Sequence, residues 1–177
     1  VKGQAVASLS ENDTEEFTVM ELIKRVNILM KHELKNAYIY LNVLMKIDEN
    51  QIIHGNVNVL VQVVNNMISN AIQAYDGKHD QNIQLEISKD SGNVIFSVTD
   101  FADNYINISI TDFAGGLPKE VQDRLFKEMV TTKGKNGTGL GLYMSYSNIK
   151  AHFGGDITYQ TEDGKGTTFN ILIPINK

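Results

Sequence analysis

Residues 131–142 read Thr-Thr-Lys-Gly-Lys-Asn-Gly-Thr-Gly-Leu-Gly-Leu, with closely spaced glycines between a lysine-bearing loop and a helical pattern of apolar residues. Glycines at the start of a helix leave backbone N–H groups unpaired, and the positive end of the helix dipole adds to their effect. The stretch therefore predicts a phosphate-binding site. A dinucleotide-binding fingerprint is a weaker interpretation, because it requires a strand immediately before the glycines. A plain loop that leads into a glycine-tolerant helix start is the third interpretation.

The chain of 177 residues has an ordinary globular composition, with 42% hydrophobic and 21% charged residues. Its 16 Lys and Arg against 21 Asp and Glu give a net charge of −5, which argues against a general nucleic-acid-binding surface. The lack of cysteine excludes disulfides, thiolate zinc sites and cysteine nucleophiles. No apolar run approaches the roughly 20 residues that span a bilayer. We expect one domain over residues 18–177, preceded by a linker or disordered segment over residues 1–17.

The hydrophobic pattern on both sides of the glycine stretch predicts the remaining elements. Apolar spacings of three and four residues predict helices over residues 17–35, 59–75 and 142–153. Turns are predicted at residues 90–92 and 103–104. Alternating apolar residues predict strands over residues 38–43, 83–87, 94–98, 106–110, 157–159 and 169–173. We expect an α/β (α+β) fold, a two-layer sandwich in which helices cover one face of a mixed, mostly antiparallel sheet.

Two asparagines, Asn66 and Asn70, lie four residues apart on the second predicted helix and therefore share one face of it. Amides beside an apolar stripe need hydrogen-bond partners or a polar ligand. A side-chain amide oxygen suits Mg²⁺, which keeps waters and phosphate oxygens among its ligands. The alternative is that both amides contact solvent.

A carboxylate, Asp112, directly follows a predicted strand and opens the stretch Asp112–Pro118, which contains the small residues Ala114, Gly115 and Gly116. It can accept a hydrogen bond from an exocyclic amine, while small residues allow a flat ring to approach the backbone. A plain turn is the alternative. Residues 164–169, Gly-Lys-Gly-Thr-Thr-Phe, predict a hairpin turn before the last strand.

Taken together and in this order, these segments resemble the catalytic ATP-binding domain of two-component sensor histidine kinases. That group shares its fold with DNA gyrase, a heat-shock chaperone family and mismatch-repair ATPases. The resemblance covers residues 18–175, and its motifs are similar to the N box at Asn66–Asn70, the first glycine box at Asp112–Pro118, the F box at Leu125–Lys133, the second glycine box at Gly137–Leu142 and the final element at Gly164–Phe169. The resemblance implies a Bergerat-type ATP-binding fold with ATP and Mg²⁺ as cofactors. It also implies a mobile ATP lid over residues 118–138.

The resemblance further implies roles for individual residues. Asn70 would ligate Mg²⁺, and Asn66 would support the phosphate or metal shell. Asp112 would accept a hydrogen bond from the adenine amino group, with Gly116 letting the base lie close and Thr168 near its edge. Asn66 and Lys133 would be the catalytic residues. The nucleotide-binding set would be completed by Ala114, Thr132, Lys133, Gly137, Thr138, Gly139, Leu140, Gly141 and Leu142.

The implied activity is transfer of the ATP γ-phosphoryl group to a histidine on a separate dimerisation domain of the same parent protein. The implied second partner is a response regulator receiver domain. Hydrolysing relatives carry a glutamate where this chain has Asn66, and an amide cannot act as a general base near pH 7. We expect a cytoplasmic domain, free or as the cytoplasmic part of a membrane-bound sensor, with no nucleic-acid partner and no direct membrane contact.

Two alternative functions stay open at this point. An ATP-hydrolysing relative of the same fold is the first. A degenerate, non-catalytic nucleotide-binding or interaction module is the second, because Ala114 stands where the family pattern has a glycine and alanine resists positive φ. The sequence His32-Glu33 looks like a phosphoacceptor box, but a strand pattern begins at Tyr38 and leaves no room for a second dimerisation helix.

Overall fold

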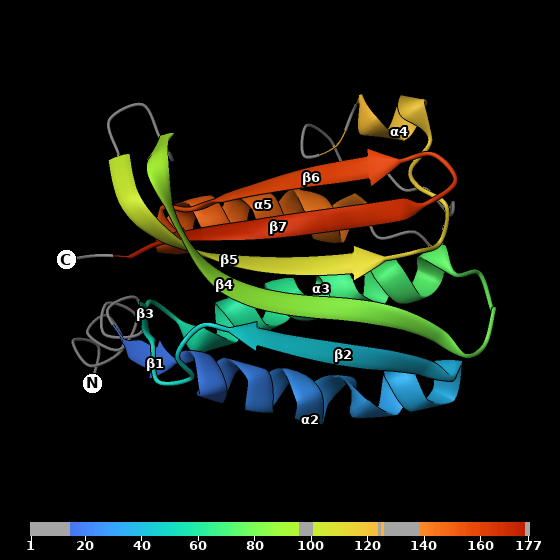
Figure 1. Cartoon of the computed structure of the whole chain (residues 1–177), viewed down its shortest axis with the longest axis horizontal. Helices are drawn as coiled ribbons and strands as arrows, with labels where there is room; N and C mark the ends of the chain where they lie inside the picture. Colours follow the sequence, from blue (N-terminus) through green and yellow to red (C-terminus); the bar gives the residue numbers. More distant parts are fainter. Residues whose placement is uncertain (1–14, 96–100, 124, 126–138, 176–177) are drawn as a thin grey trace, which may run out of the picture.

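The computed structural model describes residues 15–95, 101–123, 125 and 139–175. Three helices cover one face of a five-stranded sheet (Figure 1): α2 (Val19–Ala37), α3 (Val57–Ala74) and α5 (Gly139–Phe153). The strands lie in the order β2 (Ile39–Lys46), β4 (Gln81–Ile95), β5 (Phe101–Asp112), β7 (Gly166–Pro174) and β6 (Asp156–Glu162). β2 runs parallel to β4, and each other neighbouring pair is antiparallel. The predicted two-layer fold is confirmed.

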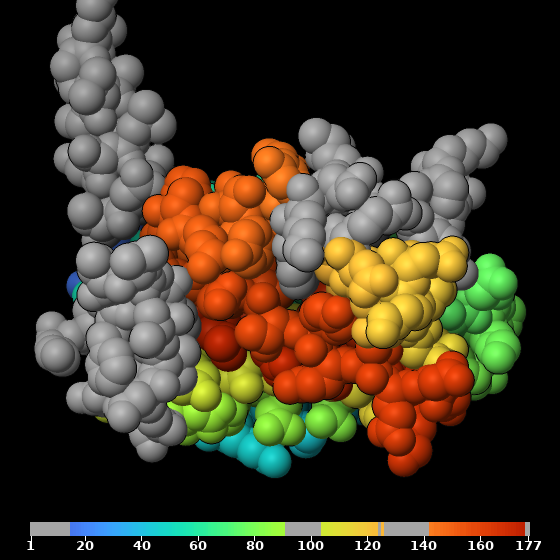
Figure 2. Space-filling view, turned by 90° about the horizontal axis from the view of Figure 1, so that it is seen from above, coloured from blue at the N-terminus to red at the C-terminus, as the bar shows by residue number. Residues whose placement is uncertain are grey.

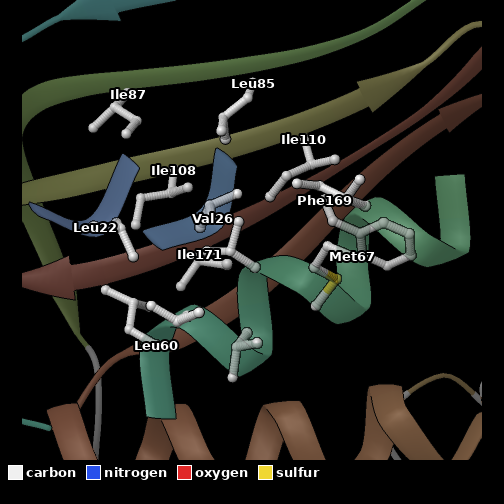
Figure 3. Close-up of a cluster of buried hydrophobic side chains, with 14 of the residues drawn as sticks. Leu22, Val26, Leu60, Met67, Leu85, Ile87, Ile108, Ile110, Phe169 and Ile171 are labelled. Atoms are coloured by element: carbon white, nitrogen blue, oxygen red, sulfur yellow. The ribbon is translucent and has the colours of Figure 1, made fainter. Parts of the chain in front are cut away.

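The core lies between the sheet and the helices, where every second strand residue points toward the helical layer. In Figure 3, Leu85 and Ile108 from the sheet face Leu60 and Met67 of α3, and all four are at most 1% exposed. The alternate strand residues form the open face of the sheet, which is polar over much of β4, β5 and β7. This alternation decides which side chains can reach a site on the helical side of the sheet.

The hairpin of β4 and β5 differs from the sequence prediction. Two strands separated by a turn at residues 90–92 were expected, but β4 continues through this segment to Ile95. The pairing register shifts between Ser91 and Val94, where two β4 residues stand opposite one residue of β5. Gly92 therefore lies in a β-bulge, which is a common use of glycine within a strand. The turn expected at 103–104 lies inside β5, and part of the strand expected at 94–98 lies outside the described residues.

A small second sheet extends the domain upstream of residue 18. β1 (Glu16–Thr18) pairs antiparallel with β3 (Ile52–His54). Phe17 is 4% exposed and belongs to the core. The sequence placed the start of the domain at residue 18. In the structure, the folded part begins before that residue. Neither three-residue strand was predicted, because so short a segment carries no readable period.

The N-terminus of α2 is capped by Thr18, whose Oγ1 accepts a hydrogen bond from the Glu21 N–H at 3.1 Å. His32 lies exposed on α2, which packs against α3 and β2 in this domain. This placement agrees with the interpretation that His32-Glu33 is not a phosphoacceptor box of a dimerisation hairpin. Within the described residues, no helix combines the length and apolar character needed to cross a bilayer.

Candidate functional site

Asp112, the turn after it and the last turns of α3 lie at one end of the sheet (Figure 1). β5 ends there at Asp112, which pairs with Ile83 at the start of β4 and with Thr167 at the start of β7. The C-terminal end of α3 and the β6–β7 hairpin lie at this same end (Figure 1). The short helix α4 (Lys119–Gln122) follows the turn after β5 and sits beside the β6–β7 hairpin in Figure 2.

Asp112 is a buried carboxylate on the helical side of the sheet, 7% exposed. Its Oδ1 accepts a hydrogen bond from the Ala114 N–H at 3.0 Å. Burial raises the pKa of Asp112 above its ordinary value, and hydrogen bonds from the backbone of Ala114 and Thr167 oppose this rise in pKa. A partly satisfied, buried carboxylate of this kind is suited to accept a further hydrogen bond from a ligand amine.

The turn after Asp112 places its unusual backbone conformations on glycines. Gly115 and Gly116 have φ values of +116° and +97°, whereas Ala114 is not among the described residues with positive φ. The methyl group of Ala114 is thus compatible with the turn, which removes the conformational objection raised by the sequence. A Cβ at Gly116 would lie 2.8 Å from the Glu162 carbonyl oxygen, so this glycine is needed for close packing against β6.

The turn and the β6–β7 hairpin are joined by hydrogen bonds. The Gly164 N–H donates to the Gly115 carbonyl at 2.9 Å, and the Leu117 N–H donates to Thr161 Oγ1 at 2.9 Å. A Cβ at Gly166 would collide with the Asp112 carbonyl oxygen. The first glycine box and the final Gly-Lys-Gly-Thr-Thr-Phe element, about fifty residues apart in sequence, therefore form one packed unit.

The side chains of Thr168 and Asp112 lie on opposite faces of the sheet, and the role expected for Thr168 at the adenine edge stays a prediction. The Thr168 side chain lies on the open face of the sheet, where its Oγ1 is 2.8 Å from Thr111 Oγ1. Thr167 is the residue on the Asp112 side, 4% exposed, with its Oγ1 2.9 Å from Thr161 Oγ1. Adjacent strand residues point to opposite faces, so only one threonine of the pair can face the helical layer.

The two predicted asparagines of α3 have different surroundings. Asn66 Nδ2 donates to Ser145 Oγ of α5 at 3.4 Å, which links the two helices. Both polar atoms of the Asn70 side chain are buried without a hydrogen-bond partner in the described part of the chain. Such groups are rare in folded proteins and point to a ligand or ion that completes them. An amide oxygen in this state fits Mg²⁺, which prefers oxygen ligands.

Tyr75 lies beside Asp112 but is not singled out by its sequence context, because it closes the apolar spacing that predicts the helix over residues 59–75. It is 2% exposed, and its hydroxyl accepts a hydrogen bond from the Phe113 N–H at 2.8 Å. The same hydroxyl donates to the Asn82 carbonyl oxygen. A buried tyrosine generally finds partners for its hydroxyl, and this was the signal available in the sequence.

The predicted phosphate-binding stretch is only partly described. Thr132, Lys133, Gly137 and Thr138 lie outside the described residues. The backbone of residues 139–141 forms the first turn of α5, and Leu142 is buried, 7% exposed. The phosphate-binding roles of this stretch, from Thr132 to Leu142, stay predictions.

Comparison with known proteins identifies the family. Residues 55–177 match the family described as histidine kinase-, DNA gyrase B- and HSP90-like ATPase. The chain is 34% identical over 131 residues to sporulation kinase E of Bacillus subtilis, a match covering 74% of this chain and 16% of that protein. It is 33% identical over 124 residues to the signal transduction histidine-protein kinase AtoS of Escherichia coli, covering 70% of this chain and 18% of that protein. The chain thus spans less than a fifth of the length of either relative.

Solved structures share the fold at lower sequence identity. The nucleotide-free catalytic domain of the histidine kinase ThkA superposes with a TM-score of 0.72 at 24% identity, covering 91% of this chain and 95% of that one. ThkA in complex with the response regulator protein TrrA gives a TM-score of 0.68 at 20% identity, covering 92% of this chain and 42% of that one. On the strength of the family match over residues 55–177, this chain belongs to the histidine kinase-, DNA gyrase B- and HSP90-like ATPases, and it is an ATP-binding domain of the sensor histidine kinase type.

Proposed function

We propose that this domain binds Mg–ATP at the Asp112 end of the sheet and donates the γ-phosphoryl group to a histidine on a separate dimerisation domain of its parent protein. A response regulator receiver domain would then take the phosphoryl group, in a cytoplasmic signalling pathway. The names of the relatives, a sporulation kinase and a signal transduction histidine-protein kinase, support this proposal. One solved relative is a histidine kinase in complex with a response regulator protein.

The observation that carries the proposal is the Asn70 side chain. Its amide oxygen and nitrogen are both buried and have no hydrogen-bond partner in the part of the chain that the structure describes. Asn70 lies on the last turns of α3, at the end of the sheet where Asp112 is buried. A metal-bound purine nucleotide needs an oxygen ligand for the metal at its phosphates and an acceptor for the amine of its base. The unpartnered Asn70 amide and the Asp112 carboxylate are groups of these two kinds.

The residues would act through hydrogen bonds and one metal contact. Asp112 would accept a hydrogen bond from the adenine amino group, and this selects ATP because guanine has a carbonyl at that place. Asn70 would supply an oxygen to Mg²⁺, whose contribution when bound is to neutralise phosphate charge. Lys133 and the backbone amides of residues 137–142 would hold the phosphates.

Transfer to a histidine is favoured over hydrolysis by the chemistry of Asn66. A hydrolysing enzyme needs a general base that removes a proton from the attacking water, and an amide cannot do this. The Asn66 amide nitrogen is also engaged with Ser145 Oγ. We therefore infer that the γ-phosphate stays intact until an imidazole acceptor arrives.

The test uses this domain with Mg–ATP that is radiolabelled on the γ-phosphate, alone and mixed with the dimerisation segment of the parent protein. We expect ATP turnover by the domain alone to be slow, and acid-labile phosphohistidine to appear on the added segment. Rapid turnover by the domain alone would favour a hydrolase. Tight ATP binding without phosphohistidine would contradict the kinase proposal. No binding of Mg–ATP in titration calorimetry would favour the degenerate module.

We infer that Thr167, and not Thr168, is the threonine nearer the bound nucleotide, and the two residues give a matched pair of variants. Thr167→Val is expected to weaken ATP binding by about 1 kcal/mol, because it removes a buried hydroxyl on the Asp112 side of the sheet. Thr168→Val removes a hydroxyl of the same type, paired with Thr111 on the open face, and should change affinity by less than about twofold. Calorimetric titration of both variants with Mg–ATP measures the difference. The reverse order of effects would restore the role first expected for Thr168.

A further inference from the structure

We propose that Tyr75 is a positioning residue for adenine recognition, whose hydroxyl fixes the backbone at Asp112 relative to the metal-binding helix. The inference rests on the proposed role of Asp112 as the acceptor for the adenine amino group. It adds a residue that contacts neither base nor phosphate in that proposal and acts through the backbone of Phe113.

The Tyr75 hydroxyl uses its donor and acceptor capacities on two separate segments. It donates to the carbonyl of Asn82 at the start of β4 and accepts from the N–H of Phe113 just after β5. Tyr75 is only 2% exposed, so its hydroxyl depends on these two protein partners. The hydroxyl therefore ties the end of α3 to the two strands that flank the predicted base site.

The Phe113 N–H belongs to the peptide that links Phe113 to Asp112, so its direction is coupled to the placement of the carboxylate. On the other side of that peptide, Asp112 Oδ1 accepts from the Ala114 N–H at 3.0 Å. Hydrogen bonds from the backbones of Ala114 and Thr167 thus hold the carboxylate, and the Tyr75 hydroxyl holds the peptide that follows it. Loss of that hydroxyl would leave both the Phe113 N–H and the Asn82 carbonyl without the partner that they share.

Tyr75 also sets the spacing between the two poles of the proposed nucleotide site. It follows Asn70 by five residues and is the C-cap residue of α3, so the two side chains are related by the end of one rigid helix. The Asn70 amide is therefore connected to the Asp112 carboxylate through the backbone at the end of α3, the Tyr75 side chain and the peptide between Asp112 and Phe113. The base and the phosphates belong to one molecule, so the residues that bind them must be held at a matching distance, and a short connection does this.

The hydroxyl stays protonated under physiological conditions, as this role requires. Burial is the main cause that raises the pKa of Tyr75, and the nearby charge of Asp112 raises it further, while the Phe113 N–H opposes both. A phenolate could accept from Phe113 but could not donate to the Asn82 carbonyl.

The test compares ATP with inosine triphosphate, which has a carbonyl in place of the adenine amino group. We expect the unmodified chain to prefer ATP, and Tyr75→Phe to reduce the ratio of the two affinities about tenfold, the effect of one disturbed buried hydrogen bond. General destabilisation lowers the folded fraction equally for both nucleotides and leaves the ratio unchanged. Tyr40→Phe is the matched control, since the Tyr40 hydroxyl donates to Asp80 Oδ1 at an exposed place outside the site, and its ratio should stay that of the unmodified chain.

The outcomes separate this inference from the proposed function beneath it. Equal affinity of the unmodified chain for both nucleotides would remove the role of Asp112. A clear ATP preference that survives in Tyr75→Phe would overturn the role of Tyr75 alone. Should Tyr75→Phe not fold, amide hydrogen exchange of the unmodified chain decides the matter. Slow exchange of the Phe113 N–H is expected from its bond to the buried hydroxyl, and exchange at the rate of an open amide would refute it.

Discussion

Replacing Asn70 with alanine is expected to abolish the magnesium dependence of ATP binding without lowering the stability of the free domain. The Asn70 amide has two buried polar atoms that no described residue satisfies, so alanine removes an unfavourable feature of the free protein. In the complex the same change removes an oxygen ligand, which should weaken Mg–ATP by at least about tenfold. Stability and affinity therefore respond differently to one substitution, which a general folding defect would not produce.

Thermal unfolding measures both effects at once. A ligand at about 100 times its Kd stabilises a protein by about 2.7 kcal/mol, which raises the Tm of a domain of this size by roughly 5–10 °C. In Asn70→Ala the rise with ATP should be small and equal with Mg²⁺ or with a chelator, while the Tm of the free protein should be unchanged or slightly higher.

Asn65→Ala is the matched control on the same helix. Asn65 Oδ1 is also buried without a partner among the described residues. Five residues of α-helix separate Asn65 from Asn70, so their side chains point about 140° apart and cannot serve one ion. The control should keep the full magnesium-dependent rise in Tm. A full rise in Asn70→Ala, or an equal loss in both variants, would place the metal elsewhere.

The fold was predictable from the sequence wherever the spacing of apolar residues along an element reflects the side that packs against the rest of the core. Ile83 and Ile106 begin alternating runs because every second residue contacts the same helices, and the structure buries both series. The turn expected at residues 90–92 was wrong for the opposite reason. Asp, Ser and Gly are locally typical of turns, but pairing with β5 continues past them and a bulge accommodates Gly92. The composition of residues 90–92 gives no information on whether a partner strand continues to pair with them.

Some features of the candidate site were also predictable from the sequence, and others were not. The sequence placed Asp112 directly after a strand and Asn70 on the helix over residues 59–75, and the structure brings the ends of these two elements to the same end of the sheet (Figure 1). Side-chain direction was less accessible, since Thr167 and Thr168 are identical in type and only the register of β7 against β5 decides which one faces Asp112. Tyr75 counted as an apolar residue in the helical period, and its hydrogen bonds depend on strands that start six or more residues later.

Asp112→Asn is expected to weaken ATP binding by about 1–3 kcal/mol while stabilising the free domain at neutral pH. The asparagine keeps a side-chain oxygen that can accept from the Ala114 N–H, but it cannot provide the ionised acceptor for the adenine amino group. In the free domain the charge of Asp112 lowers the stability of the folded state, because burial disfavours the ionised carboxylate and raises the pKa of the carboxyl. The amide carries no such penalty.

The pH dependence of stability gives this expectation a definite sign. Below the unfolded-state pKa of about 3.9 the carboxyl is protonated in both states, and the two proteins should differ little in their pH response. As pH rises from there through the raised folded-state pKa, the unfolded state loses its proton first, so Asp112 increasingly destabilises the folded state. Above that pKa the difference is constant.

Urea unfolding of both proteins across this range measures the effect. The free energy of unfolding of Asp112→Asn minus that of the unmodified chain should increase with pH and then level off. A difference that falls with pH would mean that the Asp112 charge stabilises the free domain, as a carboxylate already satisfied by protein donors would. Such a carboxylate would have little capacity left for an adenine amino group, so this outcome would also contradict the base-binding role.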